Sequence, residues 1–226
     1  MGTSGNDVLT GSSRADLLDG GSGDDEMVAG EGDDIYVVDA AGDVVTENAF
    51  EGTDTVRTTL SSYALGDHLE RLVFTGSGSF AGTGNDLDNE VVGGSGDDEL
   101  AGGLGYDRFI GGGGSDSIDG GDDWDTVVLA GKPQDYSYSI DGLGVVTISD
   151  GVNSVELTDV ESVEFSSGTT FEVAELVAKF VTGTAGNDLL LEGDDTDNVI
   201  SGLAGDDGLR GGEGADILDG GDGQDT

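Results

Sequence analysis

A nine-residue repeat is the sequence feature that most constrains how this chain can fold. Four successive units from Gly93 read GGSGDDELA, GGLGYDRFI, GGGGSDSID and GGDDWDTVV. Thirteen such units fall into three blocks, which begin at Gly2, Gly93 and Gly183. A unit this short cannot bury a hydrophobic face alone, so the units are expected to stack on one another and share a continuous core.

Two columns of the repeat carry its chemistry. Position eight is apolar in every unit that reaches it, from Leu9 to Leu218. In the third block this column contains Val199, and Ser201 is then counted as one extra residue between two units. Strand alternation would turn this position to one face, after a glycine-rich turn of six residues. Position six is Asp in all units: Asp7, Asp16, Asp25, Asp34, Asp98, Asp107, Asp116, Asp125, Asp188, Asp197, Asp207, Asp216 and Asp225.

The composition excludes several classes of protein. Among 226 residues, 49 are Asp or Glu and 7 are Lys or Arg, which gives a formal net charge of −42. This charge would repel the phosphates of a nucleic acid, and no apolar run is long enough to span a membrane. The chain has no Cys and one His, so disulfides, thiolate sites and multi-His zinc sites are excluded. The regular repeat argues against a disordered acidic tract.

The repeat resembles GGxGxDxUx, the nonapeptide of the RTX (repeats-in-toxin), or hemolysin-type, calcium-binding repeat family. The resemblance implies an all-β fold, a parallel β-roll or solenoid with two nonapeptides per coil. It also implies that turns two units apart stack on one side and hold Ca²⁺ between them. About seven sites would then pair Asp7 with Asp25, Asp16 with Asp34, Asp98 with Asp116, Asp107 with Asp125, Asp188 with Asp207, Asp197 with Asp216 and Asp207 with Asp225.

The residue types of the turns also favour calcium on chemical grounds. Carboxylate and backbone carbonyl oxygens are hard ligands, and Ca²⁺ accepts six to eight of them in a forgiving geometry. Stacked carboxylates would otherwise repel one another, although an aspartate can also cap a turn without metal. We therefore expect folding to be coupled to Ca²⁺ binding.

Some turns depart from the pattern. Arg14, Asp123 and Asp195 stand where other units have glycine, so the turns of Asp16, Asp125 and Asp197 depart most from the family motif. The acids at position five, Asp24, Asp33, Asp97 and Asp206, are expected to form a solvated acidic face rather than a ligand set.

The spacing predicts five segments along the chain. They are a first repeat block (1–37), a longer-coil β insert (38–92), a second block (93–127), a β-rich insert (128–182) and a truncated third block (183–226). Alternating residues predict strands in the inserts at 44–46, 53–60, 69–75, 136–140, 145–149, 155–158 and 163–165. Helical spacing of apolar residues predicts one short helix near 171–180.

No catalytic motif is present: the sequence lacks HExxH, GxSxG and GxxxxGK[ST], and His68 has no recognisable catalytic partner. We therefore predict a secreted, non-catalytic calcium-binding module rather than an enzyme. Two alternatives stay open: an accessory C-terminal region of a secreted hydrolase or epimerase, and a segment of an adhesin or surface layer.

The family resemblance implies an extracellular or bacterial cell-surface location, reached by type I secretion. The chain stops within a repeat unit, so we expect a fragment of a longer protein. The sequence identifies calcium ions as partners but no protein or polysaccharide partner.

Overall fold

The computed structural model describes residues 1–140, 145–183, 186–188, 191–193 and 198–226. It divides into two compact units. The first comprises residues 1–129 and 157–160, and the second comprises residues 130–156 and 161–226. Both units are built almost entirely of short strands, as the repeat predicts.

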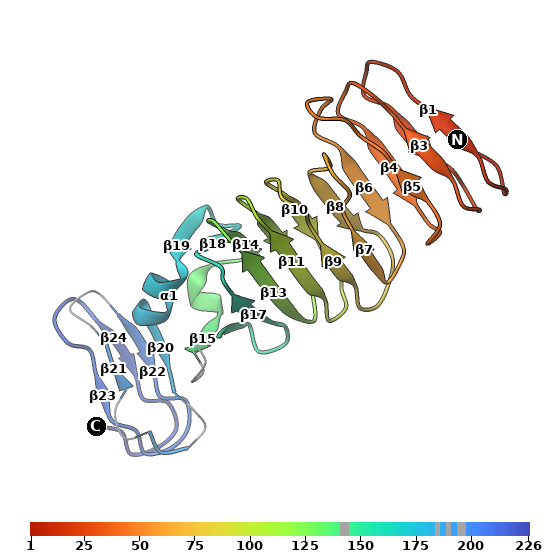
Figure 1. Cartoon of the computed structure of the whole chain (residues 1–226). Coiled ribbons are helices and arrows are strands. Elements are labelled where there is room, and N and C mark those ends of the chain that lie inside the picture. Colours follow the sequence, from red (N-terminus) through yellow and green to blue (C-terminus); the bar gives the residue numbers. More distant parts are fainter. Residues whose placement is uncertain (141–144, 184–185, 189–190, 194–197) are drawn as a thin grey trace. The chain divides into compact units, whose positions relative to one another are not determined.

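The first unit is a parallel β-solenoid, whose coils follow one another from β1 to β14 in Figure 1. Odd-numbered strands pair in the orders β1-β3-β5 and β13-β11-β9-β7, and even-numbered strands in the order β14-β12-β10-β8-β6-β4-β2. The strands are β1 (Val8–Thr10), β2 (Leu17–Asp19), β3 (Glu26–Val28), β4 (Ile35–Val38), β5 (Val44–Val45), β6 (Thr55–Thr58), β7 (Ser62–Ala64), β8 (Arg71–Phe74), β9 (Ala81–Thr83), β10 (Glu90–Val92), β11 (Glu99–Gly103), β12 (Arg108–Ile110), β13 (Ser115–Gly121) and β14 (Thr126–Leu129).

The register of these strands confirms the predicted β-roll. Val8 pairs with Glu26 and Glu99 pairs with Ser117, so two nonapeptides make one coil. Residues 38–92 belong to the same parallel sheets, because β6 pairs with both β4 and β8. The coil length changes there, since residues that pair between β4 and β6 are 20 apart in sequence and those that pair between β6 and β8 are 16 apart.

The core of the first unit lies between the two sets of strands. Position-eight side chains point into it, and the insert continues the column with Val56, Leu72 and Val91, each 0% exposed. Because successive strand residues face opposite ways, one residue in two contributes to this narrow core. The buried position-eight side chains of this unit are Leu18, Met27, Tyr36, Leu100, Phe109, Ile118 and Val127.

The second unit begins with β hairpins. Strand β15 (Ser137–Ile140) pairs antiparallel with β16 (Val146–Ser149), and β18 (Ser162–Phe165) pairs antiparallel with β19 (Thr169–Glu172). A 3₁₀ turn at Pro133–Asp135 precedes β15, and β17 (Ser154–Thr158) lies between the two hairpins in sequence. The predicted short helix is present as α1 (Val173–Lys179), with Leu176 fully buried.

The third repeat block returns to parallel pairing within the second unit. One row has the order β20-β22-β24, formed by Phe180–Thr182, Val199–Ser201 and Ile217–Asp219. The other row pairs β21 (Leu191–Glu192) with β23 (Leu209–Arg210).

The register of this block corrects one sequence prediction. Ile200 pairs with Leu218 and is 0% exposed, whereas Val199 is only half-buried. Ser201 pairs with Asp219 inside the sheet, so it is not an extra residue between units. The nine-residue frame of the repeat therefore shifts by one residue before β22, since the larger Ile200, rather than Val199, takes the inward position. Leu218 was also expected to point inward, but it is 49% exposed.

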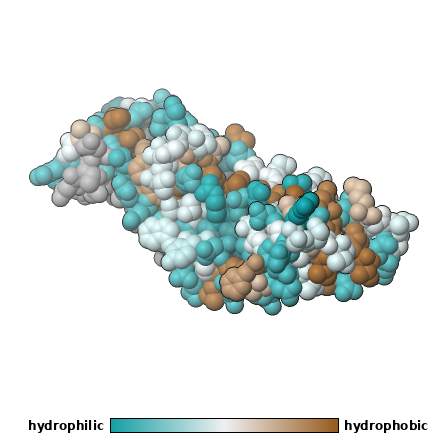
Figure 2. All heavy atoms as spheres, turned by 90° about the horizontal axis from the view of Figure 1, so that it is seen from above, coloured by the Kyte–Doolittle hydropathy of each residue, from teal (hydrophilic) through white to brown (hydrophobic). Residues whose placement is uncertain are grey.

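The surface agrees with the acidic composition. Figure 2 shows hydrophilic residues over most of the face in view, with hydrophobic residues in separate groups. In the part of the chain that the structure describes, no helix is both long and apolar enough to cross a membrane.

The inward column makes a direct stability prediction. Phe109 is 0% exposed, so Phe109→Ala leaves a cavity and should lower the free energy of unfolding by about 3–5 kcal/mol. The control Tyr106→Ala, in the adjacent turn and 63% exposed, should change it by less than about 0.5 kcal/mol. Urea unfolding in calcium-containing buffer measures both, and equal effects would contradict an inward column.

Candidate metal centre

The predicted aspartates form rows that run along the solenoid. In each pair, the backbone N–H of one Asp donates to Oδ1 of the Asp one coil later, because a coil of 18 residues, or of 19 between Asp188 and Asp207, places the two turns side by side. These bonds, 2.6–3.0 Å long, join Asp7 to Asp25, Asp16 to Asp34, Asp98 to Asp116, Asp107 to Asp125, Asp188 to Asp207 and Asp207 to Asp225. The structure thus brings these predicted partners together.

The remaining predicted pair is different. Asp197 lies outside the described residues, and the N–H that donates to Asp216 Oδ1 belongs to Asn198, at 2.9 Å. Asn198 is 1% exposed and directly precedes β22, as the aspartates of other units precede their strands. Asn198 therefore takes the place in the row that the nine-residue count assigned to Asp197.

The rows continue into the insert through residues that the nine-residue count missed. Asp25 N–H donates to Asp43 Oδ1 at 3.0 Å, and Asp34 N–H donates to Asp54 Oδ1 at 2.8 Å. Asp54 N–H donates in turn to Glu70 Oε2 at 2.8 Å. Each of these acids directly precedes a strand, and Asp43 also lies nine residues after Asp34, so a signal was available for part of this set.

The second carboxylate oxygen is where the rows become unusual. Oδ2 is buried and has no hydrogen-bond partner within the described chain at Asp25, Asp34, Asp107 and Asp207. Buried polar atoms are normally paired, and an unpaired carboxylate oxygen is especially costly, so each of these atoms points to a missing ligand.

The first two turns satisfy this oxygen within the protein. Thr3 donates its N–H and hydroxyl to Asp7 Oδ2 at 2.6 and 2.8 Å. Ser12 makes the same two bonds to Asp16 Oδ2 at 2.7 and 2.8 Å. The hydroxyl residues that replace glycine here reduce the need of these two turns for a cation.

Glycine at position one lets the unpaired oxygen lie close to the backbone. A Cβ on Gly102 would come closer than 3.0 Å to both Asp107 Oδ2 and the carbonyl oxygen of Gly120, one coil away. Gly202 has the same relation to Asp207 Oδ2 and the Gly220 carbonyl. A carboxylate oxygen and a carbonyl oxygen thus lie close together beside each of these glycines, and this donor set suits Ca²⁺.

The electrostatics of the rows are unfavourable for ionised carboxylates. Burial, together with the nearby carboxylate of Asp125, raises the pKa of Asp107 to about 7. Burial, together with the carboxylate of Asp98, raises the pKa of Asp116 to about 6. By contrast, the Thr3 hydrogen bonds lower the pKa of half-buried Asp7. A cation near the buried oxygens would remove much of this cost.

The acids at position five have a structural role. They are exposed, as expected, but Oδ1 of Asp33, Asp97 and Asp206 accepts a backbone N–H group from the following coil. Thr53 donates to Asp33 at 2.9 Å, Ser115 donates to Asp97 at 2.8 Å, and Gln224 donates to Asp206 at 2.9 Å. They therefore form a second set of bonds between coils at the outer edge of the turns.

A parallel β-solenoid whose glycine turns present rows of buried carboxylates defines a metal-binding repeat protein. The model of the RTX calcium-binding nonapeptide repeat matches in four copies, at residues 1–36, 80–118, 107–131 and 192–226, and the chain belongs to this family.

The chain is also similar to the crystal structure of the extracellular lipase LipA from Serratia marcescens, at 21% identity and a TM-score of 0.39. That match covers 77% of this chain but 33% of the lipase chain. The comparison with curated proteins gives no match.

The raised pKa values predict how the metal-free chain responds to pH. Asp107 and Asp116 have folded pKa values of about 7 and 6 against an ordinary value of 3.8. Between these limits the folded state binds more protons than the unfolded state, so stability should fall as pH rises from about 4 to about 7. The fraction of folded chain in EDTA, followed by far-ultraviolet circular dichroism at pH 5 and pH 8, measures this, and a larger folded fraction at pH 8 would contradict it.

Proposed function

We propose that this chain is a calcium-dependent folding module, in which Ca²⁺ binds in the turns and the position-six aspartates supply ligands. The observation that carries this proposal is the set of buried, unpartnered Oδ2 atoms at Asp25, Asp107 and Asp207. At each of these turns, the open oxygen lies where a Cβ would be on the position-one residue, so glycine is required there.

The net charge explains why folding would require the metal. A charge of −42 opposes compaction, and the aspartate rows place part of it in the interior. About seven Ca²⁺ would add about +14 and leave about −28. Binding of the ions then supplies free energy for folding, because the site does not exist in the unfolded chain.

We further propose that the module acts outside the cell, or on its surface, and performs no catalytic step. Extracellular calcium modules work at millimolar to submillimolar affinity, which the scarce calcium of the cytosol does not satisfy. A chain that folds only with the metal would stay extended before export and become rigid afterwards, which suits type I secretion.

A calcium titration tests the coupling between binding and folding. In EDTA the chain should show little β-structure by far-ultraviolet circular dichroism, and it should gain β-structure cooperatively as Ca²⁺ rises to the millimolar range. Mg²⁺ should replace Ca²⁺ poorly, because it prefers a strict octahedral geometry. A spectrum that stays unchanged as Ca²⁺ rises to millimolar concentration would contradict the proposal.

A matched pair of substitutions tests the role of the rows. Asp107→Asn keeps an oxygen to accept the Asn89 N–H, but it removes one charge from a turn with an open oxygen. The calcium midpoint of folding should rise about threefold to tenfold. Asp119→Asn is the control, because Asp119 is exposed in β13, and its midpoint should equal that of the parent chain. Equal midpoints for the two variants would remove Asp107 from the ligand set.

A further inference from the structure

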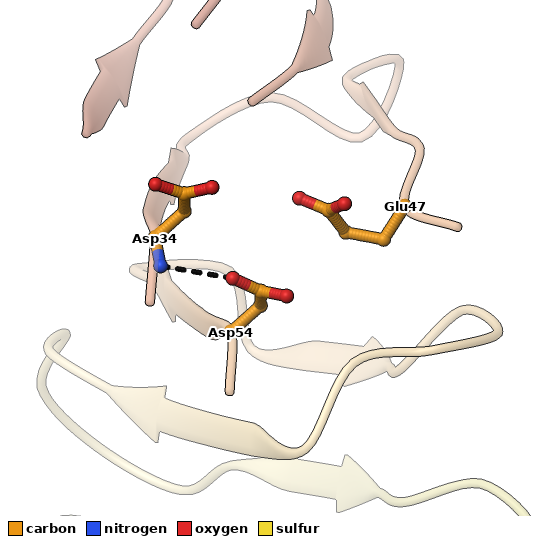
Figure 3. Close-up of side chains that lie close together, drawn as sticks. All are labelled: Asp34, Glu47 and Asp54. Carbon is orange, nitrogen blue, oxygen red and sulfur yellow. Dashed lines mark hydrogen bonds between the residues drawn. The ribbon is translucent and has the colours of Figure 1, made fainter. Parts of the chain in front are cut away.

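Three buried acids converge in the insert, away from the regular repeat turns. Asp34 precedes β4, Glu47 lies between β5 and β6, and Asp54 precedes β6. Their exposed fractions are 1%, 6% and 1%, and one carboxylate oxygen of each lies within 4.8 Å of the others. Figure 3 shows Glu47 extending toward Asp34 and Asp54 from the opposite side of the site.

The turn of Asp34 differs from the other repeat turns at position one. This position holds Ala29, whereas at the equivalent residues Gly20, Gly102 and Gly202 an aspartate oxygen lies where a Cβ would be. The carbonyl oxygen of Ala29 faces Gly11 as the carbonyl oxygens of the equivalent glycines face the preceding coil, so the backbone register is unchanged. Because Ala29 has a methyl group at this place, the Asp34 carboxylate cannot lie over position one as the aspartates of the other turns do.

Each of the three carboxylates is held by one hydrogen bond. Asp34 Oδ1 accepts the Asp16 N–H, Asp54 Oδ1 accepts the Asp34 N–H, and Glu47 Oε1 accepts the Tyr36 hydroxyl. The other oxygens of Asp34 and Glu47, Oδ2 and Oε2, are buried and have no hydrogen-bond partner in the described chain. The protein thus orients these carboxylates, brings one oxygen of each close to the others, and leaves two buried oxygens without a hydrogen bond.

The charges around this space are negative. Burial, together with neighbouring carboxylates, raises the pKa of Glu47 to about 7 and that of Asp54 to about 6. The acids that act on the three residues include Asp16, Asp33, Glu51 and Glu70, while His68 acts on Glu51 and Glu70. A cation would interact favourably with all three carboxylates at once, whereas a single proton neutralises only one of them.

We propose that Asp34, Glu47 and Asp54 form a further divalent-cation site that binds Ca²⁺ within the insert. Carboxylate oxygens from three segments suit this hard ion, and buried acids at such short separation need a compensating charge. The ion would tie the loop that carries Glu47 to the aspartate row where the coil lengthens to 20 residues. Unlike the sites under "Proposed function", this one does not use the position-one glycine of a repeat turn.

Native mass spectrometry of the full chain in Ca²⁺ tests the site by counting bound ions. Glu47→Gln preserves size and an acceptor for the Tyr36 hydroxyl but removes one charge, so it should bind one ion fewer than the parent chain. Glu31→Gln is the control, because Glu31 is exposed in the turn that precedes Asp34, and its ion count should be unchanged. A folded Glu47→Gln variant with the full count overturns the site.

A second variant serves if Glu47→Gln does not fold. Asp54→Asn retains an oxygen that can accept the Asp34 N–H and should also lose one ion. Crystals of the parent chain soaked in Mn²⁺ give a third measurement, in which an anomalous peak among the three carboxylates supports the site and its absence overturns it. If the proposed function fails, the repeat turns bind no Ca²⁺ and the parent chain binds at most one ion, so this outcome differs from failure of the insert site alone.

Discussion

The stacking of carboxylates between coils is the interaction on which the rest of the structure depends. One oxygen of each aspartate accepts a backbone N–H from the neighbouring coil, as Asp107 does from Asn89 and Asp116 does from Asp98. That bond sets the register of the coils, but it also carries the second oxygen and its charge into the interior. The same residues therefore order the solenoid and create its need for a cation, so fold and metal binding have one physical origin.

The glycines follow from this arrangement as much as from backbone conformation. Position one must lack a Cβ because an aspartate oxygen and a carbonyl oxygen of the next coil occupy its surroundings, as at Gly102. In the same turn, positions two and four adopt a left-handed backbone instead, with φ of 120° at Gly103 and 100° at Gly105. Asp123 adopts φ of 82° at position four without being glycine, which shows that the turn tolerates the replacement the sequence singled out.

The parallel β-roll and its inward column could be predicted from the sequence because both follow a constant spacing. Phe109 and Val127 are fully buried where the repeat places them. The insert escaped the same count because its coil of 20 residues shifts Asp54 out of the nine-residue frame, whereas Glu70 returns to that frame after the coil of 16 residues but is glutamate where the repeat has aspartate. The hydrogen-bond partners of Asp54 and Glu70 are determined only by which coils lie side by side in the folded chain.

Two other differences have equally specific causes. Asp197 and Asn198 are adjacent polar residues, so spacing alone could not choose between them, and the burial of Ile200 decides the register in favour of Asn198. Glu47 carried no local signal at all, since its burial depends on the Tyr36 hydroxyl nearby in the folded chain but 11 residues away in sequence.

The two sides of the insert differ in what they bury next to the aspartate rows, acids on one side and aromatic side chains on the other. On the side of the even-numbered strands the acids continue from Asp34 through Asp54 to Glu70. On the other side, the residue whose N–H bonds to Asp98 is Phe80, which is 2% exposed and stacks on Phe74 with ring centroids 4.6 Å apart. Aromatic burial stabilises a coil without any ion, so on this side the insert depends less on metal than the repeat blocks do. Calcium dependence should therefore be concentrated in the blocks and along the acidic side of the insert.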